Sequence, residues 1–239
     1  MQRYFANIVD KHALLTDEDA FHLLHVMRAK KGTEVEIVNE GIVYIGKVIG
    51  TRPLLIEIIE KTKENNELSV DLVLIMSILK GEKLDFVIQK ATEIGVSEII
   101  LLRSERCIGK IREYETEKKL KRFSKIAKEA CEQSKRSIIP VITKVIDFKQ
   151  ISLLKADYKF IGSVSSEITA KDFLKTVKAI EKHSKVMIMV GPEGGFSEKE
   201  ELLAFKNGFK PISLGRRVLR AETASIASLS VLATLLDNK

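Results

Sequence analysis

From Val70 onward, short apolar runs alternate with longer segments whose apolar residues recur at helical spacing. This alternation constrains the fold most, because strands that alternate with helices form a largely parallel sheet covered by helices. We therefore predict an α/β fold with helices over 84–94 and 115–137. The predicted strands are Leu72–Leu79, Ile99–Leu102, Val141–Thr143, Tyr158–Ile161, Val186–Val190 and Pro211–Leu214.

The first 67 residues have a different pattern. A short strand (Arg3–Ile8) and a helix that Thr16 can cap are followed by β-rich runs, which are broken at Asn39-Glu40-Gly41 and Arg52-Pro53. Short strands with such turns indicate a small β-barrel. The polar stretch Lys61–Ser69 resembles a linker, so we predict two domains, 1–67 and 68–239.

Composition excludes several classes of protein. No apolar run approaches the roughly 18 residues that span a membrane, and the N-terminus lacks the apolar core of a secretory signal, so we expect a cytoplasmic protein. Cys107 and Cys131 have neither CxxC spacing nor the number required for a disulfide framework or a zinc site, and we expect two free thiols and no metal.

Positive charge is concentrated in the second predicted domain. Residues 1–67 carry 9 Lys and Arg against 11 Asp and Glu, which leaves 31 against 22 for the remainder, a balance of +9. Such a basic field favours a polyanion such as nucleic acid, although a solvated lysine-rich face would give the same count.

Two glycine turns follow predicted strands near the C-terminus. The first, VGPEGGFSEKE (Val190–Glu200), leads into a helix that Ser197 and Glu200 can close with a capping box. It lacks the lysine of a phosphate loop and the GxGxxG spacing, and Glu193 would repel phosphate. We therefore expect a neutral or cationic ligand that is held mainly by peptide groups.

The second turn, SLGRRVLRAETA (Ser213–Ala224), follows the next strand and opens into the final helix. Both turns are thus predicted at the carboxyl edge of the sheet, where ligands bind in open α/β folds. The final helix is small and apolar around its circumference, which is typical of a helix that is buried on several sides. We expect a homodimer, with a fully buried core helix in a monomer as the alternative.

These two turns together resemble the RsmE family of SPOUT-class methyltransferases. The resemblance extends to KGEKLDFVIQKATEIGVSEIILLRSERC (Lys80–Cys107), to KIAKEACEQSKRSIIP (Lys125–Pro140), and to RYF and HLLHVMRAKKGTEV in the first domain. It implies a SPOUT-type parallel sheet with a C-terminal trefoil knot, preceded by a PUA-like β-barrel. It also implies methylation of N3 of one uridine in small-subunit (16S) ribosomal RNA with S-adenosylmethionine.

The resemblance further implies a cofactor pocket at matching positions. Its lining would comprise Gly162, Val190, Gly191, Glu193, Gly194, Gly195, Leu214, Gly215, Val218 and Leu219. Val218 and Leu219 would cover the faces of the adenine while loop peptide groups satisfy its edge. Gly162 matches least well, because IGSVSS lacks the proline-containing turn that is expected there.

Methylation at uridine N3 requires a base for the N3 proton or a cation that stabilises the uridinate. The candidate cations are Arg106 and Arg220, and the candidate bases or hydrogen-bond partners are Glu132, Gln133 and Glu222. We expect the two arginines to organise the uracil and Glu222 to order the final loop, although each residue could equally serve only to hold loops together.

RNA contacts are expected from both domains. The candidates are Arg3 and Arg28, beside His22 and His25, together with Lys121, Lys125, Lys128 and Lys135. Three other functions stay open: a methyltransferase of another SPOUT branch that acts on transfer RNA, a non-catalytic ribosome-assembly factor, and a nucleotide-phosphate enzyme. The intact glycine turns, the RAET segment and Glu193 count against the last two.

Overall fold

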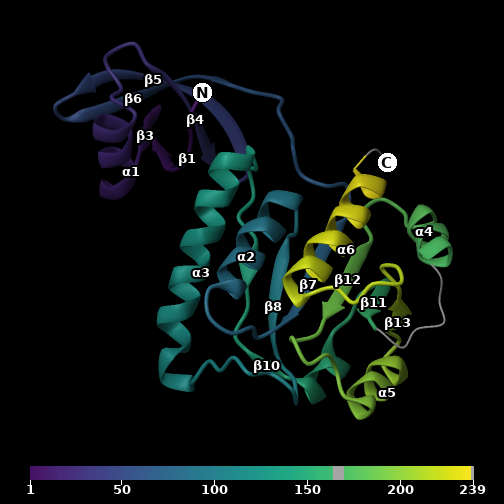
Figure 1. Cartoon of the computed structure of the whole chain (residues 1–239). Coiled ribbons are helices and arrows are strands. Elements are labelled where there is room, and N and C mark those ends of the chain that lie inside the picture. The colour runs from purple at the N-terminus through teal and green to yellow at the C-terminus, as the bar shows by residue number, and fades with distance from the viewer. Residues whose placement is uncertain (164–169, 238–239) are drawn as a thin grey trace. The chain divides into compact units, whose positions relative to one another are not determined.

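The computed structural model describes residues 1–163 and 170–237 (Figure 1). These residues form two compact units. The first comprises Met1–Glu67 together with Lys128–Ile138, and the second comprises Leu68–Ala127 and Ile139–Lys239. Among the described residues, no helix is long and apolar enough to cross a membrane.

The first unit is built on a six-stranded sheet in the order β1-β4-β5-β6-β3-β2. Its strands are β1 (Arg3–Phe5), β2 (Asn7–Val9), β3 (His12–Leu14), β4 (Glu34–Asn39), β5 (Ile42–Thr51) and β6 (Leu54–Lys61). All pairings are antiparallel except that of β1 with β4. Alternate residues point inward, so that Val35, Ile37, Val48 and Ile56 are buried together.

One short helix packs on this sheet. Thr16 caps α1 (Asp17–Phe21) as predicted, since its side chain accepts a hydrogen bond from the Asp19 backbone N–H. The helix continues as one π-helical segment, His22–Val26. Ala20, Leu23, Leu24 and Met27 recur at helical spacing, but only Leu23 is buried and Met27 is exposed, because the π-turn changes the helical periodicity.

The second unit contains a sheet whose described strand pairs are all parallel, where a largely parallel sheet was predicted; its order is β10-β8-β7-β12-β11-β13, with β9 also paired to β8. Its strands are β7 (Asp71–Ser77), β8 (Glu98–Arg103), β9 (Val141–Ile142), β10 (Ile146–Asp147), β11 (Tyr158–Gly162), β12 (Lys185–Val190) and β13 (Lys210–Ile212). Its helices are α2 (Lys83–Ile94), α3 (Glu113–Ser134), η2 (Phe148–Leu153), α4 (Ala170–Lys178), α5 (Glu198–Lys206) and α6 (Ala221–Leu236). The last seven residues of α3 belong to the first unit.

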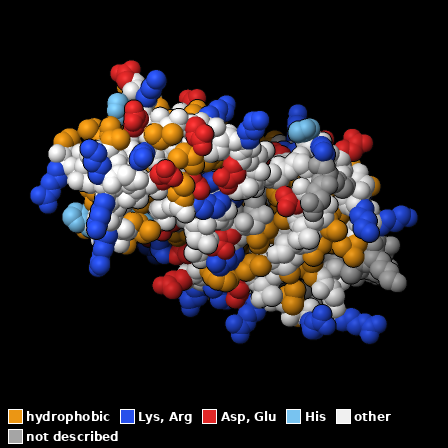
Figure 2. Space-filling view, turned by 90° about the horizontal axis from the view of Figure 1, so that it is seen from above, with side chains coloured by type: hydrophobic (Ala, Val, Ile, Leu, Met, Phe, Trp, Pro, Cys, Tyr) orange, Lys and Arg blue, Asp and Glu red, His pale blue; other side chains and the backbone are white. Residues whose placement is uncertain are grey.

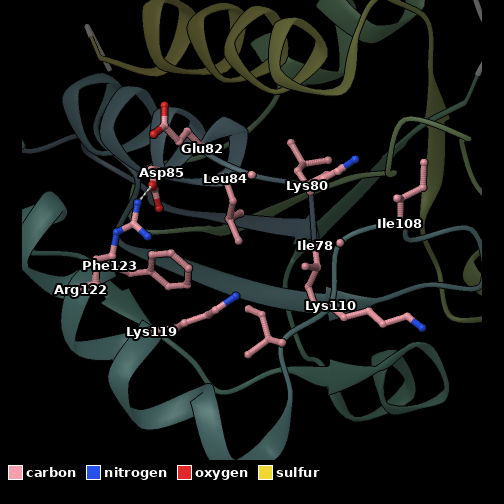
Figure 3. Close-up of a pocket in the computed structure, with 14 residues that line it drawn as sticks. Ile78, Lys80, Glu82, Leu84, Asp85, Ile108, Lys110, Lys119, Arg122 and Phe123 are labelled. Atoms are coloured by element: carbon pink, nitrogen blue, oxygen red, sulfur yellow. Dashed lines mark hydrogen bonds and ion pairs between the residues drawn. The ribbon is translucent and has the colours of Figure 1, made fainter.

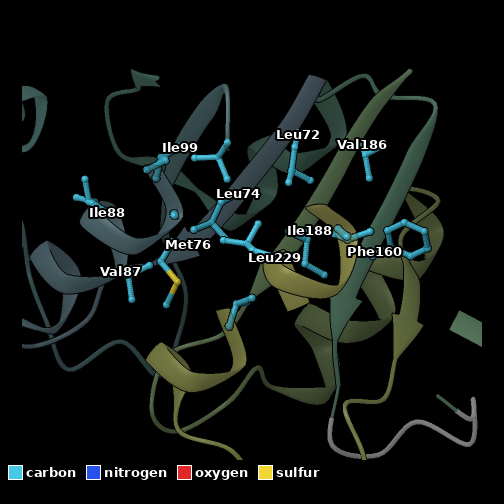
Figure 4. Packing of buried hydrophobic residues seen from close by; sticks show 14 of the residues in the cluster. Leu72, Leu74, Met76, Val87, Ile88, Ile99, Phe160, Val186, Ile188 and Leu229 are labelled. Atoms are coloured by element: carbon cyan, nitrogen blue, oxygen red, sulfur yellow. The ribbon is translucent and has the colours of Figure 1, made fainter. Parts of the chain in front are cut away.

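Both faces of this sheet are covered, because its strands are apolar on both sides. Leu72, Leu74 and Met76 of β7 face a core with α2 and α6 (Figure 4). Val73 and Ile75 face the opposite core, which includes residues of η2 and α5. Burying the sheet on two sides leaves its strand ends as the places where side chains and loops are free to form a site.

The segment Lys128–Ile138 is integrated into the first unit by buried ion pairs. Arg136 is 3% exposed and donates through Nε and Nη2 to Glu67 Oε2, while the Glu67 Oε1 atom accepts from the Ser137 and Ile138 backbone N–H groups. Sequence analysis placed this segment in the second domain and treated 61–69 as a linker. Glu67 is instead a structural residue.

Candidate active site

Three neighbouring parallel strands carry the predicted cofactor segments. β12, β11 and β13 are adjacent in the sheet, with Ile161 in register with Met189 and Gly162 with Ile212. Gly162 ends β11, the turn at 191–195 follows β12, and Leu214 and Gly215 follow β13. The three segments therefore leave the sheet side by side from the same edge, as the sequence predicted for the two glycine turns.

The first glycine turn is tight and depends on its glycines. The Gly195 N–H donates to the Pro192 carbonyl oxygen at 2.9 Å, and Gly195 has a φ of +68°, where a side chain is unfavourable. A Cβ atom on Gly191 would lie 3.3 Å from the Phe196 ring. The turn then enters α5 through the predicted capping box of Ser197 and Glu200.

Arg106 holds this turn from the loop after β8. Its Nη1 donates to the Gly194 carbonyl oxygen at 3.1 Å and to that of Phe196 at 3.3 Å. A Cβ atom on Gly194 would lie 3.2 Å from Arg106 Cβ, so the glycine permits this close approach. In the same loop, the Glu105 N–H donates to Glu200 Oε1 at 2.8 Å. Arg106 thus has a clear positioning contact, and its exposed guanidinium has further N–H groups for a ligand.

Glu193 is tied to the loop that precedes α2. The Lys83 ammonium lies 3.1 Å from Glu193 Oε1. Partial burial raises the pKa of Glu193, but hydrogen bonds from the Glu193 and Lys80 backbone N–H groups and from Lys83 outweigh burial and hold that pKa below its ordinary value. The turn therefore carries a carboxylate at neutral pH, which disfavours a phosphate ligand. Sequence analysis did not single out Lys83, although the KGEK motif contains it.

The second turn is more open. Gly215 has a φ of +106°, and its N–H donates to Ser213 Oγ at 3.3 Å. Val218 is 79% exposed and Leu219 is half-buried, so Val218 projects from the loop and is available to cover an apolar ligand. Arg220 is exposed and forms the N-cap of α6.

Three buried side-chain oxygens have no hydrogen-bond partner among the described residues, and two of them belong to the second unit. These two are Ser77 Oγ, at the end of β7, and Glu222 Oε2, in the first turn of α6. One turn further along α6, Ser225 Oγ lies 3.1 Å from Met76 Sδ, which fixes this helix against β7. Buried polar atoms without partners usually await water or a ligand. Glu222 therefore differs from a carboxylate that pairs with an arginine only to hold a loop in place.

These features suit a neutral or cationic ligand with a flat apolar part. The glycines expose peptide groups, Leu214 and Val218 offer apolar contact, and Glu193 and Glu222 provide negative charge. S-adenosylmethionine combines an adenine with a sulfonium cation, and the residues present fit it. They do not fit a triphosphate, because the glycine turn presents a carboxylate in place of a lysine.

The other two candidate bases, Glu132 and Gln133, belong to the first unit. In that unit the Lys128 ammonium lies 2.6 Å from Asp19 Oδ1 and 3.1 Å from Glu132 Oε1. Burial raises the pKa of Glu132, with Lys128 opposing and Asp19 adding to the shift. Gln133 is exposed on the same stretch of α3. Glu132 thus has a defined structural role in an ion-pair cluster.

The predicted RNA contacts divide into exposed and engaged residues. Arg28 is exposed, whereas Lys121 pairs with Glu117 and Lys128 with Asp19 and Glu132. Arg3 is fully buried and pairs with Glu36 and Glu64, so its guanidinium is not exposed for phosphate contact. Sequence analysis did not predict this burial, because both carboxylate partners are distant from Arg3 in the sequence.

The remaining candidates vary in environment. Lys125 is exposed and Lys135 is half-buried against Glu36. His22 accepts or donates a hydrogen bond at 2.9 Å with the Tyr4 hydroxyl, and His25 stacks on Phe21. On the face seen in Figure 2, lysines and arginines project around the edge and acidic side chains lie between them. Phosphate contact would thus depend on local placement.

Comparison with known proteins gives consistent matches. Residues 66–233 match the RNA methyltransferase domain family, and residues 15–59 match the RNA methyltransferase PUA domain family. The chain is 33% identical to ribosomal RNA small subunit methyltransferase E of Bacillus subtilis, over 97% of this chain and 96% of that protein. It is 34% identical to the protein of the same name from Mesomycoplasma hyopneumoniae, over 96% and 98%.

Two solved structures are similar throughout. That of ribosomal RNA small subunit methyltransferase E from Neisseria gonorrhoeae, bound to S-adenosylmethionine, has a TM-score of 0.87 and 30% identity, with 98% of each chain covered. That of a methyltransferase from Legionella pneumophila, in complex with the same cofactor, has a TM-score of 0.86 and 31% identity, with 97% of this chain and 96% of that chain covered.

Proposed function

Because the chain belongs to the ribosomal RNA small subunit methyltransferase E family, we propose that it transfers a methyl group from S-adenosylmethionine to N3 of one uridine in 16S ribosomal RNA. The observation that carries the proposal is the common exit of three segments, at Gly162, Gly191 and Leu214, from adjacent parallel strands. Three neighbouring loops are enough to surround an adenosyl group with peptide N–H and C=O groups.

The loops have separate roles in this proposal. The backbone of the first turn, Gly191, Gly194 and Gly195, approaches the cofactor, while Leu214, Val218 and Leu219 cover the adenine. Glu193 keeps the first turn attached to Lys83 and repels free nucleotides. The bound cofactor supplies an electrophilic methyl on its sulfonium; the protein supplies alignment and electrostatics.

The target nitrogen loses a proton as it gains the methyl group. The N3–CH₃ bond forms as the S–CH₃ bond breaks, and the N3 proton passes to a base or to water. In our proposal Arg220, exposed at the start of α6, stabilises the negative charge on the uracil. Arg106 assists from the glycine turn, and the partnerless Oε2 of Glu222 accepts a hydrogen bond in the loaded site.

The wider functional setting is also a proposal. Arg28 on the first unit and Lys121 and Lys125 on α3 are the residues we assign to phosphate contact, now without Arg3. We further propose a homodimer through the outer face of α6, where the apolar side chains of Ile226, Val231 and Leu235 are only half-buried. A cytoplasmic location and the trefoil knot remain predictions that accompany this assignment.

One experiment tests cofactor, target and product together. The protein is incubated with methyl-labelled S-adenosylmethionine and small ribosomal subunits, and the modified nucleoside is mapped by mass spectrometry. We expect label in a single 3-methyluridine of 16S RNA. Label in transfer RNA, or calorimetric binding of ATP with none of S-adenosylmethionine, would contradict the proposal. The role given to Arg220 is tested by the single-turnover methylation rate of Arg220→Ala. A rate within about threefold of wild type, roughly 0.7 kcal/mol in activation free energy, would exclude that role.

A further inference from the structure

A cavity of about 390 Å³ lies in the second unit (Figure 3), and none of its lining residues is among those assigned to the cofactor. Its walls come from the β7–α2 connection, the loop between β8 and α3, and the first half of α3. This volume falls within the range of about 300–1,000 Å³ that is typical of small-molecule sites. The cavity is therefore large enough to receive part of a ligand rather than a single water molecule.

The lining combines an apolar floor with positive charge. Ile78, Leu84 and Phe123 are buried and form the floor. Four cationic side chains also line the cavity, Lys80, Lys110, Lys119 and Arg122. Two acidic side chains, Glu82 and Asp85, accompany them. Arg122 and Asp85 form an ion pair with each other. The remaining charged side chains of the lining are one carboxylate, Glu82, and three lysines. The cavity thus has an excess of positive charge beside an apolar surface.

Lys119 is the cation best placed for a ligand. Its side chain points toward the space between Leu84 and Phe123, whereas Lys110 extends away from it (Figure 3). Within residues 1–163 and 170–237, Lys119 makes no ion pair. The Asp85 carboxylate, which pairs with Arg122, also interacts electrostatically with Lys119 but forms no close ion pair with it. A half-buried ammonium without a close ion pair can bind an anionic ligand group.

Two connections join this cavity to the glycine turn. The β7–α2 connection lines the cavity with Lys80 and Gly81, and the Lys80 N–H of this connection and the ammonium of Lys83, the first residue of α2, hold Glu193. The loop after β8 lines the cavity with Ile108 and Gly109, and its Arg106 holds Gly194. A Cβ on Gly109 would lie 2.3 Å from the Leu79 carbonyl oxygen, so the two connections are in direct contact.

We propose that this cavity binds a nucleotide that flanks the target uridine in the substrate RNA, with its phosphate at Lys119 and its base against Ile78, Leu84 and Phe123. The inference rests on the proposed function. A ribonucleotide combines a phosphate anion with a flat base, and the lining provides a contact for each. Seating a neighbouring nucleotide here would present the target uridine to the cofactor turn through the two shared connections.

The test compares two neighbouring lysines of α3. Lys119→Met removes the charge that faces the cavity, and Lys118→Met is the matched control, because Lys118 is exposed and lies outside the lining. We expect Lys119→Met to lower the single-turnover methylation rate at subsaturating RNA by at least fivefold and Lys118→Met by less than twofold. Lys119→Arg should restore the rate, and calorimetric affinity for S-adenosylmethionine should stay within twofold in all three variants.

RNA binding provides the second measurement. The slope of log K against log salt should fall by about 0.7–0.9 in Lys119→Met, which corresponds to one phosphate contact. In synthetic RNA, an abasic residue on one side of the target uridine should weaken wild-type binding more than it weakens binding by Lys119→Met. Equal effects of the two methionine variants, or abasic RNAs that bind wild type as well as intact RNA, would overturn the inference.

Failure of the proposed function has a different signature. If wild-type protein produced no methylated uridine, the proposed function would be refuted. The comparison of RNA binding by Lys119→Met and Lys118→Met would still test the cavity. If wild-type protein methylated uridine and the two variants behaved alike, only the flanking-nucleotide site would fall.

Discussion

Arg106 donates from Nη1 to the carbonyl oxygen of Gly194 at 3.1 Å, across 88 positions of the sequence. The contact joins the loop after β8 to the turn after β12, two strands that are separated in the sheet by β7. A charged donor on a peptide carbonyl fixes the position of that peptide without adding bulk. The geometry of the cofactor turn therefore depends on a side chain from another part of the sequence.

Replacing Arg106 should loosen this turn. We expect Arg106→Ala to raise the dissociation constant for S-adenosylmethionine by about tenfold to a hundredfold, since a charged hydrogen bond contributes about 1.5–3 kcal/mol. Arg103→Ala is the control: Arg103 is also exposed near the end of β8 but pairs with Asp147. Calorimetry with both variants checks the expectation, and equal affinities would show that the turn holds its shape unaided.

Alanine substitutions at two glycines distinguish the effect of backbone strain on stability from an effect on cofactor binding. Gly195 and Gly208 have φ values of +68° and +83°, and a Cβ on either would meet no atom within 4 Å. Alanine at either position should lower the free energy of unfolding by about 1 kcal/mol through the left-handed conformation alone. Only Gly195→Ala should weaken S-adenosylmethionine binding, because Gly208 lies beyond α5. Denaturant unfolding and calorimetry on the two variants measure both effects.

The ion pair between Lys83 and Glu193 should give a pH-dependent contribution to stability. Because the pKa of Glu193 in the folded protein is below the ordinary value of 4.5, its stabilising effect is present above that value and disappears as the pH falls through the folded pKa. Lys83→Met should cost less than about 1 kcal/mol at pH 7, since both side chains are partly exposed. Unfolding curves of wild type and variant should converge at acidic pH; a constant gap would contradict the pairing.

Glu132 should behave in the opposite sense. Its pKa is raised by burial, so ionisation at neutral pH works against folding, and this cost vanishes once the pH falls below the ordinary value. We expect Glu132→Gln to unfold at the same or a higher Tm than wild type at pH 7, with the difference shrinking toward pH 4. The variant should also retain single-turnover methylation within a few-fold, and a loss of several hundredfold would restore Glu132 as the base.

The features that were predictable from sequence are mostly local ones. Strand and helix alternation gave the parallel sheet, and Ser197 with Glu200 gave a capping box, because period and capping act over a few residues. The two turns were placed at one sheet edge from strand order alone. The trefoil knot rests on the resemblance and stays a prediction.

Long-range ion pairs were missed for a common reason. Arg3, Glu67 and Lys83 lie in polar or mixed stretches that resemble solvated surface, and their partners are distant in the sequence. Thr92 of α2 is a further example, since its hydroxyl donates to the Ile88 carbonyl oxygen within the helix and the residue is fully buried. Burial of a polar side chain is visible only when its partner is known.

The buried pairing of Arg136 with Glu67 has a consequence for biosynthesis. The first 67 residues leave the ribosome well before residues 128–138 are made, so until then Glu67 and Arg3 lack the partners that these residues provide. The amino-terminal unit can reach its final form only after more than half of the polypeptide has been translated. A fragment that stops at residue 67 should consequently need the missing peptide, added in trans, to attain its native fold.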